Sequence, residues 1–315
     1  MNTRPFIIDC DTGCDDTLAL LAALSSPEMK ILGITSCNGN VPEKAVAKNN
    51  LDLMEYLGYE VTVTRGAYLP LLGNPDSNAD ADIHGATGLG NITLPEAKKM
   101  KFSDEIASEF IYRMAKEYQG ELEILVTGPL TNVAICIIEY PDFKDLVKHI
   151  YFMGGSTIGG NCNTTAEFNI WADPTAAHMV LTSGIPTSMV GLNVTNIALM
   201  YEEDEQELRD QGNKACTLAA DVLDYMINRK NQDIRAARMH DPLALACALY
   251  PECLRMEKYY GDVETKGDFT KGHTAIDIYS KSNKEKNVDV AVAVDVVKFK
   301  KWLKERIMKT GEELR

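Results

Sequence analysis

The sequence predicts an α/β protein with a Rossmann-like, open and mostly parallel sheet, helices on both faces, and a C-terminal antiparallel extension. Short apolar segments alternate with amphipathic ones up to residue 191, the pattern of βαβ units. Polar clusters follow directly after several predicted strands, and open α/β sheets bind ligands at the carboxyl ends of their strands. These clusters are residues 9–16, 38–40, 127–128 and 154–169.

In the first 191 residues, strands and helices are expected to alternate. An apolar strand over residues 6–10 leads into a helix over 15–25, which Pro27 ends. Residues 65–100 form a long segment rich in Gly, Pro and Asn, and a loop of that length is usually functional. Further strands are expected at 31–36, 60–64, 122–126, 149–153 and 186–191, and further helices at 42–57, at 103–118, from 128 and from 173.

Beyond residue 200 the pattern changes. Residues 202–230 predict one or two charged amphipathic helices, and an apolar helix follows over 239–250. Residues 256–295 predict antiparallel strands, including 274–279 and 288–294. A last amphipathic helix is expected over 295–308.

The composition is that of a globular protein with an acidic surface. The 315 residues are 45 % hydrophobic, enough for one large domain, and we expect a single domain over 1–315. The net charge of −14 disfavours nucleic acid and anionic membranes as partners. No C-x-x-C pair, no apolar signal region in Met1–Pro5 and no membrane-length apolar stretch occur. We therefore expect a cytoplasmic protein with reduced thiols.

The most informative segment is an acidic cluster after the first strand. Asp9, Asp11, Asp15 and Asp16 lie within eight positions, and like charges this close raise each other's pKa unless a cation neutralises them. Oxygen ligands at this density suit calcium or magnesium. A solvated turn that caps the next helix would explain Asp15 and Asp16. It would not explain two acids at the end of a buried strand.

Other candidate residues each have a structural and a functional interpretation. Asn40 could be a turn residue, and His84 could be an inert loop histidine or one that a ligand approaches closely. Glu167-Phe168-Asn169 could cap the helix that begins at Asp173. Asp241 precedes a proline-initiated helix, as an N-cap does, but could equally bring a carboxylate to the cation. His240 beside it could then assist a leaving group.

With these residues in view, the chain resembles the inosine–uridine preferring nucleoside hydrolases from Asp9 to about Trp302. The core of the resemblance is the aspartate cluster D-x-D-x-x-x-D-D at residues 9–16. The order and spacing of the other motifs agree as well. They are Gly39-Asn40, residues 82–85, residues 127–132, residues 153–155, residues 166–169, residues 172–174 and His240-Asp241-Pro242.

The resemblance implies a calcium-dependent enzyme of nucleoside salvage that cleaves the N-glycosidic bond of ribonucleosides, giving free base and ribose. It implies that Asp11, Asp16, Asp241 and the carbonyl of Thr127 hold Ca²⁺, with Asp11 as the general base on a bound water. Asp9 is expected to support these residues through hydrogen bonds. The resemblance also suggests a homodimer or homotetramer.

The remaining expected roles concern the substrate. The resemblance implies that the ribose diol contacts Asp15, Asn40 and Asn169, and that the 5′-hydroxyl contacts Asn161 and Glu167. It also implies that His84 lines the base pocket and that His240 assists departure of the base. Two features depart from the family pattern. Asn193 stands where an aspartate is expected, and the segment 222–236, which contacts the base in the family, has Tyr225 as its aromatic residue. Purine or pyrimidine preference is therefore not assigned from the sequence.

Two other functions are compatible with parts of the sequence. A magnesium-dependent phosphohydrolase would use Asp9 as nucleophile, but it expects Thr or Val where Gly13 stands. A non-catalytic ribose-binding module would have no need of a general base, so the combination of Asp11, Asp15 and His240 argues against it.

Overall fold

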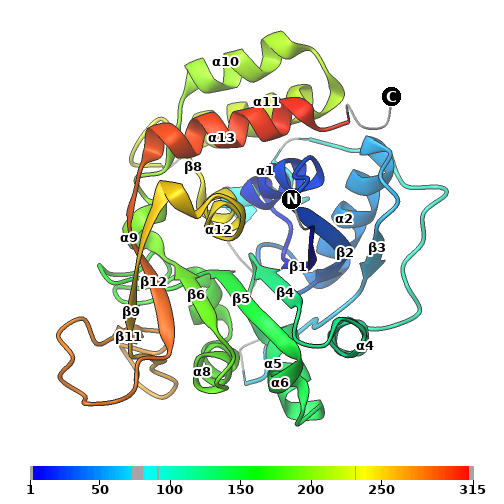
Figure 1. Cartoon of the computed structure of the whole chain (residues 1–315). Coiled ribbons are helices and arrows are strands. Elements are labelled where there is room, and N and C mark those ends of the chain that lie inside the picture. The colour runs from blue at the N-terminus through cyan, green and yellow to red at the C-terminus, as the bar shows by residue number, and fades with distance from the viewer. Residues whose placement is uncertain (1–2, 73–80, 91, 231, 312–315) are drawn as a thin grey trace.

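The structure, a computed structural model, describes residues 3–72, 81–90, 92–230 and 232–311. Its centre is an eight-stranded sheet of order β3-β2-β1-β4-β5-β6-β12-β9 (Figure 1). Every neighbouring pair is parallel except β12 with β9, so the predicted fold class is confirmed. The strands are β1 Arg4–Cys10, β2 Met29–Ser36, β3 Thr62–Thr64, β4 Leu122–Val126, β5 Val147–Met153, β6 Thr187–Val190, β9 Leu254–Tyr259 and β12 Val288–Val294.

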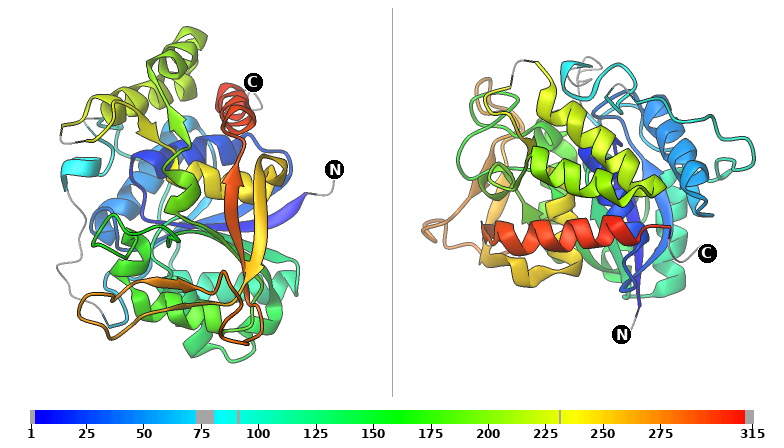
Figure 2. Two further views of the ribbon diagram at one scale, coloured as in Figure 1. Left: turned by 90° about the vertical axis from the view of Figure 1, so that its left-hand side faces the viewer. Right: turned by 90° about the horizontal axis from the view of Figure 1, so that it is seen from above.

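Helices cover both faces of this sheet (Figures 1 and 2). Alternate residues of a strand face opposite sides, and in β1 Phe6 and Ile8 join one core cluster while Ile7 joins the other. The first cluster packs against α1 Cys14–Leu24, α2 Glu43–Leu57, α11 Lys214–Asn228, α12 His240–Leu249 and α13 Val296–Lys309. The second packs against α4 Ala107–Tyr118, α5 Thr131–Glu139, α6 Phe143–Leu146 and α8 Pro174–Thr182.

The C-terminal third completes the sheet rather than forming a separate layer. The expected antiparallel pairing occurs between β9 and β12, and between β10 Gly261–Val263 and β11 Thr274–Ile276. However, β12 also lies parallel to β6 and so continues the main sheet. The strand expected over 274–279 is shorter than predicted, because Asp277 accepts backbone N–H groups of Lys281 and Ser282 in a turn.

Several short elements that the sequence did not predict lie in the connections. They are α3 Ala81–His84, α7 Phe168–Ala172, α9 Leu192–Thr195, the 3₁₀ turn Pro251–Cys253, and the paired strands β7 Leu199–Met200 and β8 Ala237–Arg238. Among the described residues, no helix combines the length and apolar character that crossing a bilayer requires. All eight cysteines are free thiols.

A buried carboxylate joins α10 Glu202–Gln211 to α13. Asp204 accepts the backbone N–H of Tyr201 at 3.0 Å and forms ion pairs with Lys300 and, at 3.1 Å, with Lys304. Burial raises the pKa of Asp204, but the hydrogen bonds from Lys300, Tyr201 and Lys304 together outweigh it, so its pKa lies below the usual value. The ionised form of Asp204 therefore stabilises the folded state.

We expect Asp204→Asn to lower the free energy of unfolding by roughly 1–2 kcal/mol at pH 7, because hydrogen bonds to charged partners are lost. The folded-state pKa is depressed, so this contribution is present above the unfolded pKa of about 3.9 and disappears as the pH falls through the folded value. Urea unfolding at pH 7 and at a series of lower pH values down to about pH 2 measures both effects. Glu207→Gln is the matched control, because Glu207 pairs with the same Lys304 but is half exposed. An equal loss in both variants, or one independent of pH, would contradict this account.

Candidate active site

The carboxyl ends of four neighbouring strands meet at one edge of the sheet. The acidic cluster follows β1, Asn40 follows β2, Thr127 follows β4, and Met153 ends β5. Because these strands are parallel, loops far apart in the sequence converge there, as expected for an open α/β sheet. The N-terminus of α12 reaches the same edge and contributes Asp241.

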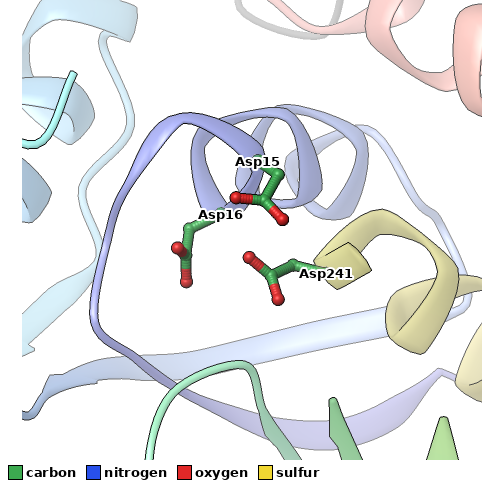
Figure 3. Close-up of side chains that lie close together, drawn as sticks. All are labelled: Asp15, Asp16 and Asp241. Atoms are coloured by element: carbon green, nitrogen blue, oxygen red, sulfur yellow. The ribbon is translucent and has the colours of Figure 1, made fainter. Parts of the chain in front are cut away.

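Three carboxylates from two helices converge at this edge. Asp15 and Asp16 lie in the first turn of α1 and Asp241 in the first turn of α12. One oxygen from each lies within 4.8 Å of the others (Figure 3). The sequence interpretation placed Asp11 rather than Asp15 in this group. The structure sets Asp11 beside it, with its Oδ2 accepting the backbone N–H of Asn40 at 2.7 Å.

All four side chains are buried, with exposures of 5 % or less. Burial, followed by the charge of Asp16, raises the pKa of Asp15 to about 7 and raises that of Asp11 well above its usual value. Burial and the other three carboxylates raise the pKa of Asp241 well above its usual value, and burial also raises that of Asp16. Within the described ranges, none of the four forms an ion pair with Lys, Arg or His.

Neutral hydrogen-bond donors hold the cluster in place. Asp16 Oδ2 accepts the backbone N–H of Gly13 at 2.8 Å and the side-chain amide of Asn40 at 3.1 Å. Asp16 Oδ1 accepts the hydroxyl of Thr127 at 2.7 Å. The buried Oδ1 of Asp11 has no partner in the described part of the chain. The arrangement therefore orients negative oxygens without neutralising them.

Asp9 lies apart from the pocket. It is fully buried and accepts hydrogen bonds from Thr35 and, at 2.7 Å, from Asn132. A nucleophile must reach its substrate, so this burial argues against a phosphohydrolase that uses Asp9.

A pocket of about 530 Å³ opens at this edge of the sheet, within the range of small-molecule sites. The predicted site residues that line it are Asp15, Asn40, His84, Thr127, Asn161, Glu167, Asn169, His240 and Asp241. Asp11 and Asp16 are not among the lining residues and are almost completely buried.

One wall of the pocket carries two histidines. The Nδ1 atom of His84 accepts the backbone N–H of Cys14 at 3.1 Å, and Nδ1 of His240 lies 2.8 Å from the hydroxyl of Thr195. Burial, helped by nearby arginines, lowers the pKa of both rings to about 3. Both imidazoles are thus neutral at physiological pH. Gly13 allows the approach of His84, because a Cβ there would lie 2.4 Å from its Nδ1.

The segment 161–171 also lines the pocket. Asn169 donates its side-chain amide to the carbonyl oxygens of Thr127 at 2.7 Å and Met153 at 3.1 Å. Glu167 caps α7 and accepts the backbone N–H groups of Gly155, Asn169 and Ile170. Burial raises its pKa to about 7. The side-chain oxygen of Asn161, nearer the surface, accepts the backbone N–H of Phe168 at 2.9 Å.

The pocket also contains residues to which sequence reasoning assigned no role. They are Ile83, Met153, Cys162, Phe168, Trp171, Asn196, Met226, Arg229, Asp233 and Arg238. Met226, Arg229 and Asp233 belong to the segment 222–236, which the family resemblance indicated as a base-contacting segment without assigning these residues. Asn193 does not line the pocket; its amide donates to the carbonyl of Ala291 at 2.7 Å and so anchors α9 to β12.

A second hollow of about 530 Å³ lies between α10 and α13, away from these carboxylates. Its Lys300 and Lys304 pair with Asp204 and Glu207, so its charges largely neutralise one another. Strongly shifted pKa values of carboxyl and imidazole groups gather in or directly beside the first pocket, at Asp11, Asp15, His84, Glu167, His240 and Asp241. The first pocket is therefore the candidate active site.

Comparison with known proteins agrees with this geometry. Residues 6–301 match the family model for inosine-uridine preferring nucleoside hydrolase. The chain is 36 % identical to the pyrimidine-specific ribonucleoside hydrolase RihA of Salmonella paratyphi C, over 96 % of this chain and 98 % of that one. The structure of the purine-preferring ribonucleoside hydrolase from Gardnerella vaginalis is 35 % identical, with a TM-score of 0.91 over 98 % of this chain and all of that one. The plant nucleoside hydrolase PpNRh1 is 31 % identical, with a TM-score of 0.91 over 97 % and 99 % of the two chains. The chain therefore belongs to the inosine-uridine preferring nucleoside hydrolase family.

Proposed function

We propose that this protein is a calcium-dependent ribonucleoside hydrolase of nucleoside salvage, which cleaves the N-glycosidic bond to give free base and ribose. The observation that carries the proposal is a single pocket that brings together buried carboxylates and two neutral imidazoles. Family membership supports the same reaction.

The donor set fits a hard divalent cation. The cluster supplies only oxygen atoms, its carboxylates have no positive partner among the described residues, and the buried Oδ1 of Asp11 lacks a hydrogen bond. We assign Asp11, Asp16, Asp241 and the carbonyl of Thr127 as the residues that would hold Ca²⁺. When bound, the ion would lower the pKa of a coordinated water and hold the ribose diol.

We assign the general base to Asp11. Its Oδ2 already accepts the Asn40 N–H, so Oδ1 remains to take the proton of the attacking water. Burial raises the affinity of this carboxylate for a proton.

The ribose diol is assigned to Asp15, Asn40 and Asn169. Both donor contacts of the Asn169 amide are made to backbone carbonyls, so its Oδ1 is left to accept from a sugar hydroxyl. The 5′-hydroxyl is assigned to Asn161 and Glu167, which line the pocket in the same segment as Asn169. Oriented acceptors of this kind would favour ribose over 2′-deoxyribose, because a missing hydroxyl leaves buried groups unpaired.

We assign the base to the part of the pocket that His84 and His240 line. His84 would line the site of the base, and His240 would lie beside the glycosidic nitrogen. Cleavage passes through an oxocarbenium-like sugar. The carboxylates stabilise its positive charge electrostatically, while the imidazoles face the base as it leaves.

We expect the purified protein with Ca²⁺ to release base from at least one member of a panel of inosine, guanosine, adenosine, xanthosine, uridine and cytidine. The panel includes both base classes because relatives of similar identity carry opposite preferences in their names. Asp11→Asn should lower kcat by at least about a hundredfold, because the general base is lost. Release of reducing sugar and of base is measured in parallel.

The control variant is Asp104→Asn, an exposed aspartate outside the pocket, which should leave kcat unchanged. If no nucleoside is cleaved but calorimetry detects ribose binding, a non-catalytic ribose-binding module replaces the hydrolase. Phosphate release from p-nitrophenyl phosphate would instead favour a phosphohydrolase.

We expect Ca²⁺ to raise the melting temperature of chelator-treated protein. At a concentration of 100 Kd the gain in stability is about 2.7 kcal/mol, which corresponds to several degrees for a chain of this size. Asp16→Asn and Asp241→Asn should each abolish the shift, whereas Asp104→Asn should retain it. A wild-type protein that does not respond to Ca²⁺ would overturn the calcium assignment, even if it is active.

We further propose that the protein works in the cytoplasm, which its eight free thiols support.

The family resemblance leads us to propose a homodimer or homotetramer, which analytical ultracentrifugation would determine.

A further inference from the structure

A fully buried threonine contacts the ring of His240. The Oγ1 atom of Thr195 lies 2.8 Å from Nδ1 of His240. Thr195 does not line the pocket, so it cannot touch a substrate bound there. Its contact is to the edge of the imidazole that carries Nδ1.

The fold fixes this contact from both sides. Thr195 ends α9, which Asn193 anchors to the carbonyl of Ala291 in β12. A few residues later, β7 pairs with β8, the strand that leads into His240. The backbone N–H of Met239 also donates to the carbonyl of Ala198 at 2.9 Å. The segments that carry the threonine and the histidine are therefore held in register.

The surroundings of the hydroxyl set the direction of the hydrogen bond. Thr195 Oγ1 makes no other hydrogen bond in the described part of the chain. If the ring donated from Nδ1, the buried hydroxyl proton would have no acceptor there, an arrangement that costs stability. The favoured arrangement is therefore Thr195 O–H donating to Nδ1, which leaves the ring proton on Nε2.

His84 has the same tautomer for an independent reason. Its Nδ1 accepts the backbone N–H of Cys14 at 3.1 Å, so a neutral ring must carry its proton on Nε2. Two separate contacts, one from a backbone amide and one from a hydroxyl, thus give both pocket histidines an Nε2–H donor.

We propose that Thr195 is a positioning residue that holds His240 in the tautomer whose Nε2–H donates to the departing base, an inference that rests on the proposed hydrolase function. The C1′–N bond breaks with its electron pair passing to the base, and a C1′–O bond forms to the water oxygen. The two water hydrogens end on the new ribose hydroxyl and on the base. The Nε2–H hydrogen bond stabilises the electron pair as it develops, and its proton is not consumed.

The test compares two leaving groups in two variants. Thr195→Val removes the hydroxyl at nearly constant volume, and Thr195→Ser retains it. For the best natural nucleoside we expect Thr195→Val to lower kcat by roughly ten- to a hundredfold, while Thr195→Ser stays within about threefold of wild type. With p-nitrophenyl riboside, whose leaving group is a stable anion, we expect Thr195→Val to change kcat by less than about twofold.

An equal loss on both substrates would show that Thr195 has only a structural role, and no loss on either would show that the contact is unimportant; each overturns the proposal. Nitrogen-15 NMR of the histidine rings tests it without turnover. The wild-type protein should show His240 protonated on Nε2, and Thr195→Val should shift the tautomer ratio. A wild-type ring protonated on Nδ1 would overturn the proposal. Inactivity of the wild type on every nucleoside would instead overturn the hydrolase function, and the NMR result would still decide the tautomer.

Discussion

Four buried carboxylates must be held close together with no positively charged partner among the residues that the structure describes, and the architecture around them meets this constraint. The first turns of α1 and α12 both face the cluster (Figure 3), so two helix dipoles place partial positive charge where the negative charge is concentrated. Backbone and side-chain donors from Gly13, Asn40 and Thr127 orient the oxygens. What these neutral groups leave uncompensated is the charge that a divalent cation, and then a cationic sugar, would satisfy.

The carboxylates and the imidazoles of the pocket shift their pKa values in opposite directions for the same physical reason. Burial disfavours charge, so it raises the pKa of Asp15 and lowers that of His84 and His240. A site built this way keeps its histidines as neutral hydrogen-bond donors. It also makes hydrogen-bond geometry, rather than overall charge, the property that governs the part of the pocket lined by the histidines.

Local patterns predicted most of the fold, whereas most candidate site residues came from the family resemblance. The alternation of strands and helices predicted the parallel sheet, and polar residues after predicted strands placed Asn40, Thr127 and Asn169 at one edge of it. The parallel contact of β12 with β6 could not be predicted, because an alternating apolar strand has the same sequence pattern in either pairing. Thr195 was missed because its side-chain contact with His240 joins residues that are distant in sequence. Asp15 was separated from the carboxylate group because spacing alone does not say which way consecutive side chains of a first helical turn point.

The three carboxylates that could hold a metal ion are far apart in the sequence. Asp15 and Asp16 lie near the start of the chain and Asp241 lies in its last third. During synthesis Asp15 and Asp16 leave the ribosome long before Asp241 is made. The three carboxylates can therefore come together only after the strands from β1 to β6 have been synthesised. Non-local contacts of this kind form late because the entropy of closing the intervening chain must first be overcome. Binding of one ion by all three side chains would therefore report that α1 and α12 have packed against each other.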